Sequence, residues 1–84
     1  MARVRLSRKA ADDLEELPAA IHARVSEVFA RLARWPNVSG AKPLRGNLTG
    51  RYRMRTGDYR IQFRVEGDVV TVEKIGHRSR FYED

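Results

Sequence analysis

The feature that most constrains this sequence is a pair of alternating runs on either side of Gly57-Asp58. In both runs, polar residues, nearly all of them arginines, alternate with apolar or aromatic residues. A two-residue turn that begins with glycine joins antiparallel strands into a β-hairpin. The turn also sets the register, and it predicts three cross-strand pairs on one face: Arg55–Arg60, Arg53–Gln62 and Arg51–Arg64.

The two faces of this predicted hairpin differ in chemistry. One face pairs Met54 with Ile61 and Tyr52 with Phe63, which is typical of a sheet packed against helices. The other face carries five arginines, although like charges directly across a sheet are unfavourable. Guanidinium groups bind phosphate bidentately and stack on bases. The arginine face therefore predicts a polyanion site, and the alternative is a charged surface that only keeps the sheet soluble.

The rest of the chain predicts an α+β fold. A strand at residues 2–6 precedes a helix capped by Ser7, and Pro18 separates that helix from a second one. The second helix has an apolar stripe that ends before Pro36: Ile21, Val25, Val28, Phe29, Leu32 and Trp35. A loop at residues 37–47 leads to the hairpin, and a last strand covers residues 69–75. The order β-α-α-β-β-β predicts two helices packed on one face of a small antiparallel sheet.

Length and composition narrow the classes of protein. The 84 residues suit a single domain over residues 1–84. The absence of cysteine excludes a disulfide scaffold, a thiol nucleophile and a cysteine-based zinc site, and it fits a reducing cytosol. We find no signal peptide and no apolar run near the roughly 20 residues that cross a bilayer. We therefore expect a soluble cytoplasmic protein with no membrane partner.

The positive charge is concentrated in one segment. The net charge is +6 for the whole chain, and residues 42–64 alone hold seven basic residues against a single acidic one, Asp58. A cluster of this kind is typical of proteins that bind nucleic acid. Residues Lys42 and Arg45, which precede the hairpin, belong to the same cluster.

Several motifs along the chain resemble those of the RelE/ParE toxin superfamily. They are Lys42-Pro43-Leu44-Arg45-Gly46, Tyr52-Arg53-Met54-Arg55, Gly57-Asp58-Tyr59-Arg60, Gly76-His77-Arg78 and Tyr82. The resemblance covers essentially the whole length. It implies a type II toxin with a cognate antitoxin, and it favours the RelE branch, whose members cleave mRNA in the ribosomal A site.

The resemblance also implies which residues act. By position, the basic residues of the first hairpin strand fall on Arg53 and Arg55, the arginine after the turn on Arg60, the tail arginine on Arg78 and the tyrosine on Tyr82. Metal-free RNA cleavage needs groups that align the 2′-hydroxyl, move protons and stabilise negative charge. We expect Arg60, Arg78, Tyr82 and His77 to be catalytic and these residues to bind RNA: Lys42, Arg45, Arg51, Arg53, Arg55 and Arg64.

The sequence departs from the best-known RelE enzymes at two positions, where Arg53 and Arg55 replace lysines. Arginine keeps its proton throughout the accessible pH range, so it is a poor general base. Proton transfer would then fall to Tyr82 or His77. No metal or other cofactor is expected.

Two alternative functions are open at this stage. A ParE-like toxin has the same fold but inhibits DNA gyrase without cutting RNA. A non-catalytic module would use the arginines only to bind nucleic acid or an antitoxin. Substitution of Arg78 or Tyr82 discriminates the module, because a pure binder would lose little activity.

Overall fold

The computed structural model describes residues 1–82, and their elements follow the predicted order with two additions. In chain order they are β1 (Arg3–Leu6), α1 (Arg8–Glu15), α2 (Ala19–Leu32), β2 (Lys42–Pro43), η1 (Gly46–Leu48), β3 (Arg51–Thr56), β4 (Tyr59–Glu66) and β5 (Val69–His77). The α+β class is confirmed. The additions, β2 and the 3-10 helix η1, lie in and just beyond the predicted loop at residues 37–47.

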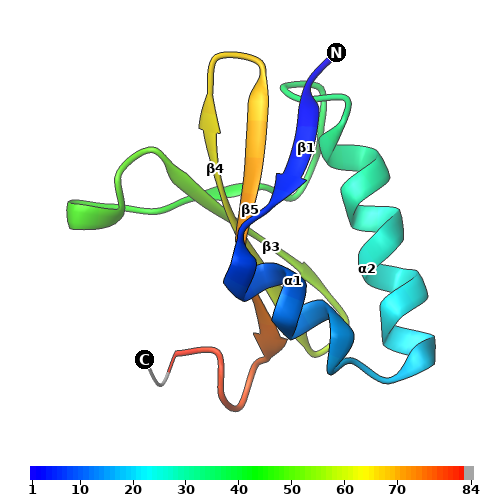
Figure 1. Ribbon diagram of the computed structural model, residues 1–84. Coiled ribbons are helices and arrows are strands. Elements are labelled where there is room, and N and C mark those ends of the chain that lie inside the picture. Colours follow the sequence, from blue (N-terminus) through cyan, green and yellow to red (C-terminus); the bar gives the residue numbers. More distant parts are fainter. Residues whose placement is uncertain (83–84) are drawn as a thin grey trace.

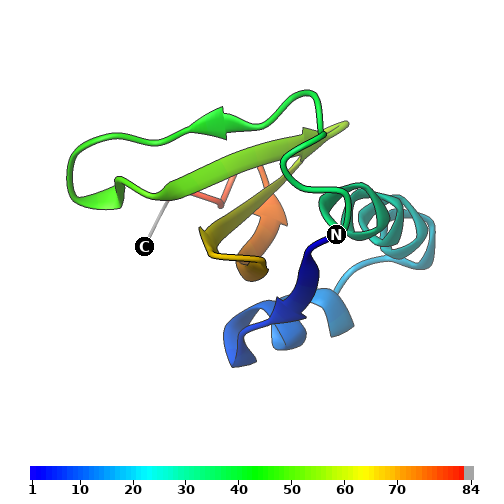
Figure 2. The ribbon, with the colours of Figure 1, turned by 90° about the horizontal axis from the view of Figure 1, so that it is seen from above.

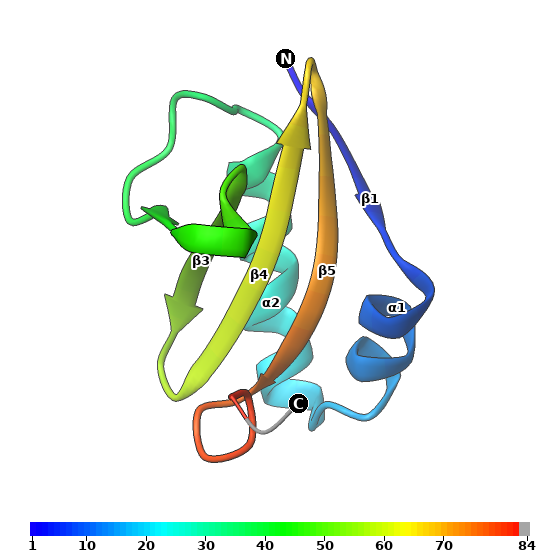
Figure 3. The same ribbon diagram turned by 90° about the vertical axis from the view of Figure 1, so that its left-hand side faces the viewer.

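The strands form one sheet with the order β1-β5-β4-β3-β2 (Figure 1). Helix α2 packs behind this sheet, and the opposite face of β3 and β4 is open (Figure 3). The prediction of a purely antiparallel sheet is wrong at β1, which runs parallel to β5. Hairpin rules apply only to strands joined by a short turn, whereas most of the chain separates β1 from β5.

The predicted hairpin register is confirmed pair by pair, with Arg55 opposite Arg60, Arg53 opposite Gln62 and Met54 opposite Ile61. Gly57 has a φ of 58° at the first position of the turn. That conformation suits glycine, which has no Cβ to clash, and it matches the twist of the two strands.

The core lies between α2 and the apolar sheet face, with Phe63 at its centre and fully buried. The Trp35 ring stands edge-on to Phe63 at 5.5 Å between centroids, and Tyr52 stacks on Phe63 at 5.6 Å. Trp35 packs as predicted, but α2 ends at Leu32. After Leu32 the hydrogen bonds change to the i→i−3 type at Arg34 and Trp35, and Pro36 disfavours the helical conformation for Trp35.

The outer edge of β5 is closed by β1 and then by α1. Ser7 caps α1 as predicted by accepting from the Ala10 N–H at 3.1 Å. One turn later the Asp13 carboxylate accepts a 3.0 Å hydrogen bond from the backbone N–H of Ile75. Past the end of β1, the edge of β5 is therefore satisfied by a side chain at Ile75. Fewer free backbone groups remain on this edge for another chain to pair with.

Candidate nucleic-acid interface

A pocket of about 430 Å³ is formed by side chains of β2, β3, β4 and the C-terminal segment. We call it the basic pocket, and its polar lining consists of five residues that the sequence analysis singled out: Lys42, Arg53, Arg55, Arg60 and Tyr82. Strand pairing brings most of them together. Lys42 in β2 lies opposite Arg53 in β3, and Arg55 in β3 lies opposite Arg60 in β4.

Among residues 1–82, the cations of the basic pocket have no acidic partner. Within residues 1–82, no carboxylate forms an ion pair with Lys42, Arg53, Arg55 or Arg60. The Arg60 guanidinium is oriented by the hairpin turn, because its Nη1 donates to the carbonyl oxygens of Gly57 at 3.1 Å and Tyr59 at 3.2 Å. The pocket therefore offers a concentrated positive charge to a phosphate group.

Tyr82 reaches the basic pocket from the C-terminal segment. Its side chain is 61% exposed, and its ring lies 5.3 Å from the Arg53 guanidinium carbon in a cation–π contact. An exposed ring beside a guanidinium is suited to stacking on a base.

Phe81 holds this segment in place, a role that was not predicted from the sequence. Its ring is 3% exposed, the Lys74 ammonium lies 4.7 Å from the ring centroid, and Lys74 also donates to the Phe81 carbonyl oxygen. The adjacent Tyr82 ring packs edge-on against it at 5.3 Å. Gly76 interrupts the inward–outward alternation of β5. The alternation therefore could not predict which way Phe81 faces.

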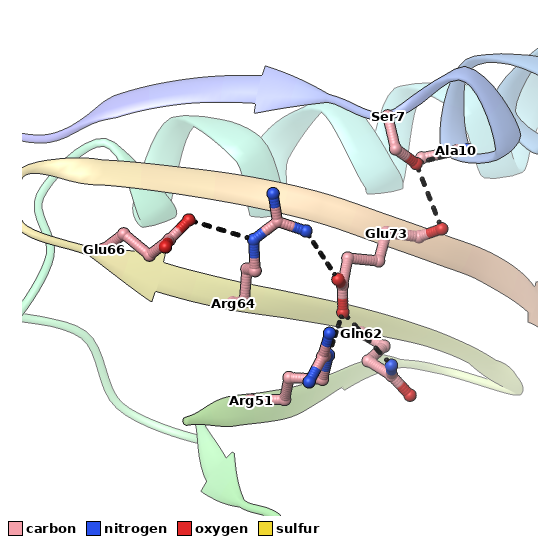
Figure 4. Close-up of polar contacts among 7 residues, drawn as sticks. All are labelled: Ser7, Ala10, Arg51, Gln62, Arg64, Glu66 and Glu73. Carbon is pink, nitrogen blue, oxygen red and sulfur yellow. Dashed lines mark hydrogen bonds and ion pairs between the residues drawn. The ribbon is translucent and has the colours of Figure 1, made fainter. Parts of the chain in front are cut away.

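Two of the five arginines on the sheet face lie outside the basic pocket, in a cluster around Glu73 (Figure 4). The Glu73 carboxylate accepts from Arg51 Nε and from Arg64 Nη1, both at 2.8 Å. It also accepts from the Gln62 amide at 3.3 Å, and Glu66 accepts from Arg64 Nε at 3.2 Å. Alternation along β5 places Glu73 on this face, next to the buried Val72, and a β-bulge beside Gln62 sets Lys74 opposite Gln62.

The Glu73 cluster shifts the ionisation of its members. Burial alone would raise the pKa of Glu73, but the hydrogen bonds from Arg51, Arg64 and Gln62 outweigh it and hold that pKa below its ordinary value. The hydrogen bond to Glu73, followed by that to Glu66, raises the pKa of Arg64. Both groups stay charged at neutral pH, so Glu73 neutralises part of the arginine face.

Two further candidates, Arg78 and Arg45, do not line the basic pocket. The Arg78 backbone N–H donates to the Asp58 carbonyl oxygen at 2.7 Å, and Arg78 Nε lies 3.6 Å from the Asp58 carboxylate. Arg78 thus approaches the same turn as Arg60. Arg45 precedes η1 and is exposed.

His77 lies in a different pocket, beside α1. Its Nδ1 is 2.8 Å from the Ser79 hydroxyl and accepts from the Ser79 backbone N–H at 3.1 Å, and its ring stands edge-on to Tyr59. The structure does not bring His77 together with the basic pocket.

A family model described as the ParE toxin of the type II toxin–antitoxin system parDE matches residues 4–82. The chain belongs to the ParE toxin family. Among curated relatives of this ParE-family toxin, Toxin RelG of Mycobacterium tuberculosis is 39% identical over 82 residues, which cover 94% of this chain and 93% of RelG. Toxin RelE of the same organism is also 39% identical over 82 residues, which cover 94% of this chain and 84% of that toxin.

Solved structures agree with this assignment. The toxin–antitoxin complex RelBE2 from M. tuberculosis contains a chain that matches with a TM-score of 0.81 and 36% identity, over 93% of this chain and 92% of that one. The isolated E. coli RelE toxin matches with a TM-score of 0.78 over 92% of this chain and 84% of that one. At 18% identity it supports the fold alone. The expected RelE/ParE resemblance and the assignment as a type II toxin are confirmed.

No helix within residues 1–82 is long and apolar enough to cross a membrane. Over the same residues, no group of three or more histidine, aspartate or glutamate side chains is arranged to hold a metal ion.

Proposed function

We propose that this toxin is an endoribonuclease that cleaves mRNA on the ribosome. The observation that carries the proposal is the basic pocket, where four cations and one exposed tyrosine converge without a neutralising carboxylate in residues 1–82. RNA supplies its own nucleophile, so such an enzyme needs only to align the backbone, stabilise charge and move protons.

In the proposed reaction the 2′-hydroxyl oxygen attacks the adjacent phosphorus and the bond from phosphorus to the 5′-oxygen breaks. The products are a 2′,3′-cyclic phosphate and a 5′-hydroxyl end. Arg60 stabilises the extra negative charge of the transition state because the hairpin turn fixes its guanidinium. Arg53 and Arg55 hold the backbone, and Arg78 assists from the turn.

Proton transfer falls to the pocket side chains that exchange a proton, namely Tyr82 and Lys42, since arginine keeps its charge. Tyr82→Phe keeps the ring on Arg53 but removes the hydroxyl. A fall in cleavage of about 10²-fold or more in this variant supports proton transfer by Tyr82. Full activity would assign its role to stacking and move attention to Lys42.

We further infer that the toxin acts in the cytoplasm and is held inactive by an antitoxin. The RelBE2 chain at 36% identity was solved as a toxin–antitoxin complex. Ribosome and mRNA are partners that the proposed reaction requires.

The test is translation of a defined mRNA in a purified ribosome system, with new 5′ ends mapped by primer extension. We expect cuts in ribosome-bound message and a loss of about 10²–10³-fold in Arg60→Ala. Arg31→Ala is a matched control, because Arg31 is exposed on α2, behind the sheet. No cuts by folded wild-type protein would refute the proposal.

The family model itself is named for ParE, so gyrase inhibition is the second candidate. A DNA supercoiling assay in the presence of the toxin tests it. Inhibition of supercoiling together with intact mRNA would assign the toxin to that target.

A further inference from the structure

We propose that the open sheet face carries a second binding site, which takes a nucleobase bearing an exocyclic amino group. The inference rests on the proposed function, because the base belongs to the RNA whose phosphate the basic pocket holds. The site is a hollow of about 510 Å³, and its lining consists of Lys9, Asn47, Leu48, Arg51, Gln62, Glu73 and Lys74. We call it the base subsite.

The base subsite adjoins the basic pocket within the sheet. Gln62, which lines the base subsite, is the cross-strand partner of Arg53, which lines the basic pocket. Such partners are about 5 Å apart between Cα atoms, which is less than the span of one nucleotide. A chain with its phosphate on Arg53 therefore has an adjacent base within reach of Gln62. Helix η1 lies on the side of the sheet opposite α2 and forms one wall (Figure 2).

The chemistry of the base subsite suits a base rather than a phosphate. The Glu73 carboxylate is only 15% exposed and holds Arg51 and Arg64. Of the two lysines in the lining, Lys9 pairs with Asp13 and Lys74 donates to the Phe81 carbonyl oxygen. The subsite therefore presents less unpaired positive charge than the basic pocket. Leu48 contributes an apolar wall that is 38% exposed. A flat base can pack against this wall while its polar edge forms hydrogen bonds with the floor of the subsite, which we define as the side chains of Gln62 and Glu73.

The polar groups of this floor retain unused hydrogen-bonding capacity. A carboxylate has about four acceptor positions, and Glu73 uses three of them for Arg51, Gln62 and Arg64. The Gln62 amide oxygen points away from Glu73 (Figure 4). Within residues 1–82, the Asn47 side chain makes no hydrogen bond.

These groups discriminate among the bases. Glu73 and the Gln62 oxygen are acceptors and therefore favour an exocyclic amino group, as in cytosine, adenine and guanine. The amide of Asn47 supplies the complementary donor, and an amide pairs bidentately with an edge that offers a donor beside an acceptor. Uracil has a carbonyl oxygen where cytosine has its amino group, so that oxygen would face the carboxylate.

The first experiment compares the binding of 3′-cytidine monophosphate and 3′-uridine monophosphate to the full chain by NMR titration. The two nucleotides carry the same phosphate, so the basic pocket contributes equally to both. We expect cytidine monophosphate to bind about fivefold or more tightly, with shifts of the Asn47 and Gln62 side-chain amide signals. Equal affinities would overturn the base subsite.

Substitutions locate the discrimination. Asn47→Ala and Gln62→Ala should each lower the preference for cytidine monophosphate. Asn47 is exposed in η1, so its replacement should not impair folding. Asn37→Ala is the matched control, because Asn37 is exposed and does not line the base subsite. A preference that survives both test substitutions would refute the assignment to these residues.

The binding test needs no catalysis, so it separates the two proposals. If wild-type protein discriminates between the nucleotides but cuts no mRNA, the base subsite stands and the ribonuclease proposal fails. If it cuts mRNA without discriminating, the ribonuclease proposal stands and the base subsite fails.

Discussion

At the scale of single residues, Glu73 determines how many arginines on the open sheet face remain available to a polyanion. It holds Arg51 and Arg64 through two 2.8 Å hydrogen bonds and leaves Arg53, Arg55 and Arg60 without an acidic partner in residues 1–82. Glu73 thus assigns Arg51 and Arg64 a structural role and leaves the other three arginines of this face available for binding.

This division predicts a pH dependence of stability. The pKa of Glu73 is lowered by folding, so its stabilising effect is present above its ordinary pKa of about 4.3 and is lost as the pH falls through the lowered value. Glu73→Gln should reduce the free energy of unfolding near neutral pH by about 1–3 kcal/mol. Urea denaturation of both proteins measures the difference, which should shrink in acid. A constant difference down to the acid limit of the fold would contradict this account.

A second residue-scale prediction concerns the core. Phe63 is fully buried and contacts both Trp35 and Tyr52, so Phe63→Ala should lower the free energy of unfolding by about 3–5 kcal/mol. Phe29 is a matched comparison because it is only partly buried at the edge of the core. Its replacement by alanine should cost less, and equal losses in urea denaturation would show that the core is centred elsewhere.

At the scale of elements, the segment after β5 folds back so that the buried Phe81 places Tyr82 beside Arg53. Phe81→Ala should therefore lower mRNA cleavage nearly as much as Tyr82→Ala, although Phe81 does not line the basic pocket. Phe81→Leu refills most of the space and should restore activity. The measurement is cleavage rate alongside amide hydrogen exchange of residues 77–82. Full activity with a freely exchanging tail would exclude a positioning role.

At the scale of the whole molecule, the fold gathers positive charges in one pocket, and this should make RNA affinity depend on salt concentration. The basic pocket gathers four cations, and each phosphate contact to single-stranded RNA contributes a slope of about −0.7 in log affinity against log salt. A slope near −3 is therefore expected. Glu73→Gln leaves Arg51 without its acidic partner, whereas Arg64 keeps Glu66. The slope should therefore become steeper, which fluorescence anisotropy over a salt series would detect. An unchanged slope would show that Arg51 does not reach the RNA.

The sequence by itself determined the local structure. The alternation around Gly57-Asp58 predicted the hairpin register and its two faces correctly, and Ser7 marked the start of α1. The apolar stripe predicted which face of α2 is buried. These features depend on periods of two and 3.6 residues and on turn and cap chemistry, all of which act between near neighbours in the chain.

Only the tertiary structure decided how distant segments meet. The parallel pairing of β1 with β5, the hydrogen bonds from Arg51 and Arg64 to Glu73, and the return of Phe81 to the sheet each join residues from different elements. A periodic pattern states which side of an element is buried, but not which other element covers it. For this reason the sequence predicted a basic face, whereas the fold selected the part of that face that forms a pocket with Tyr82.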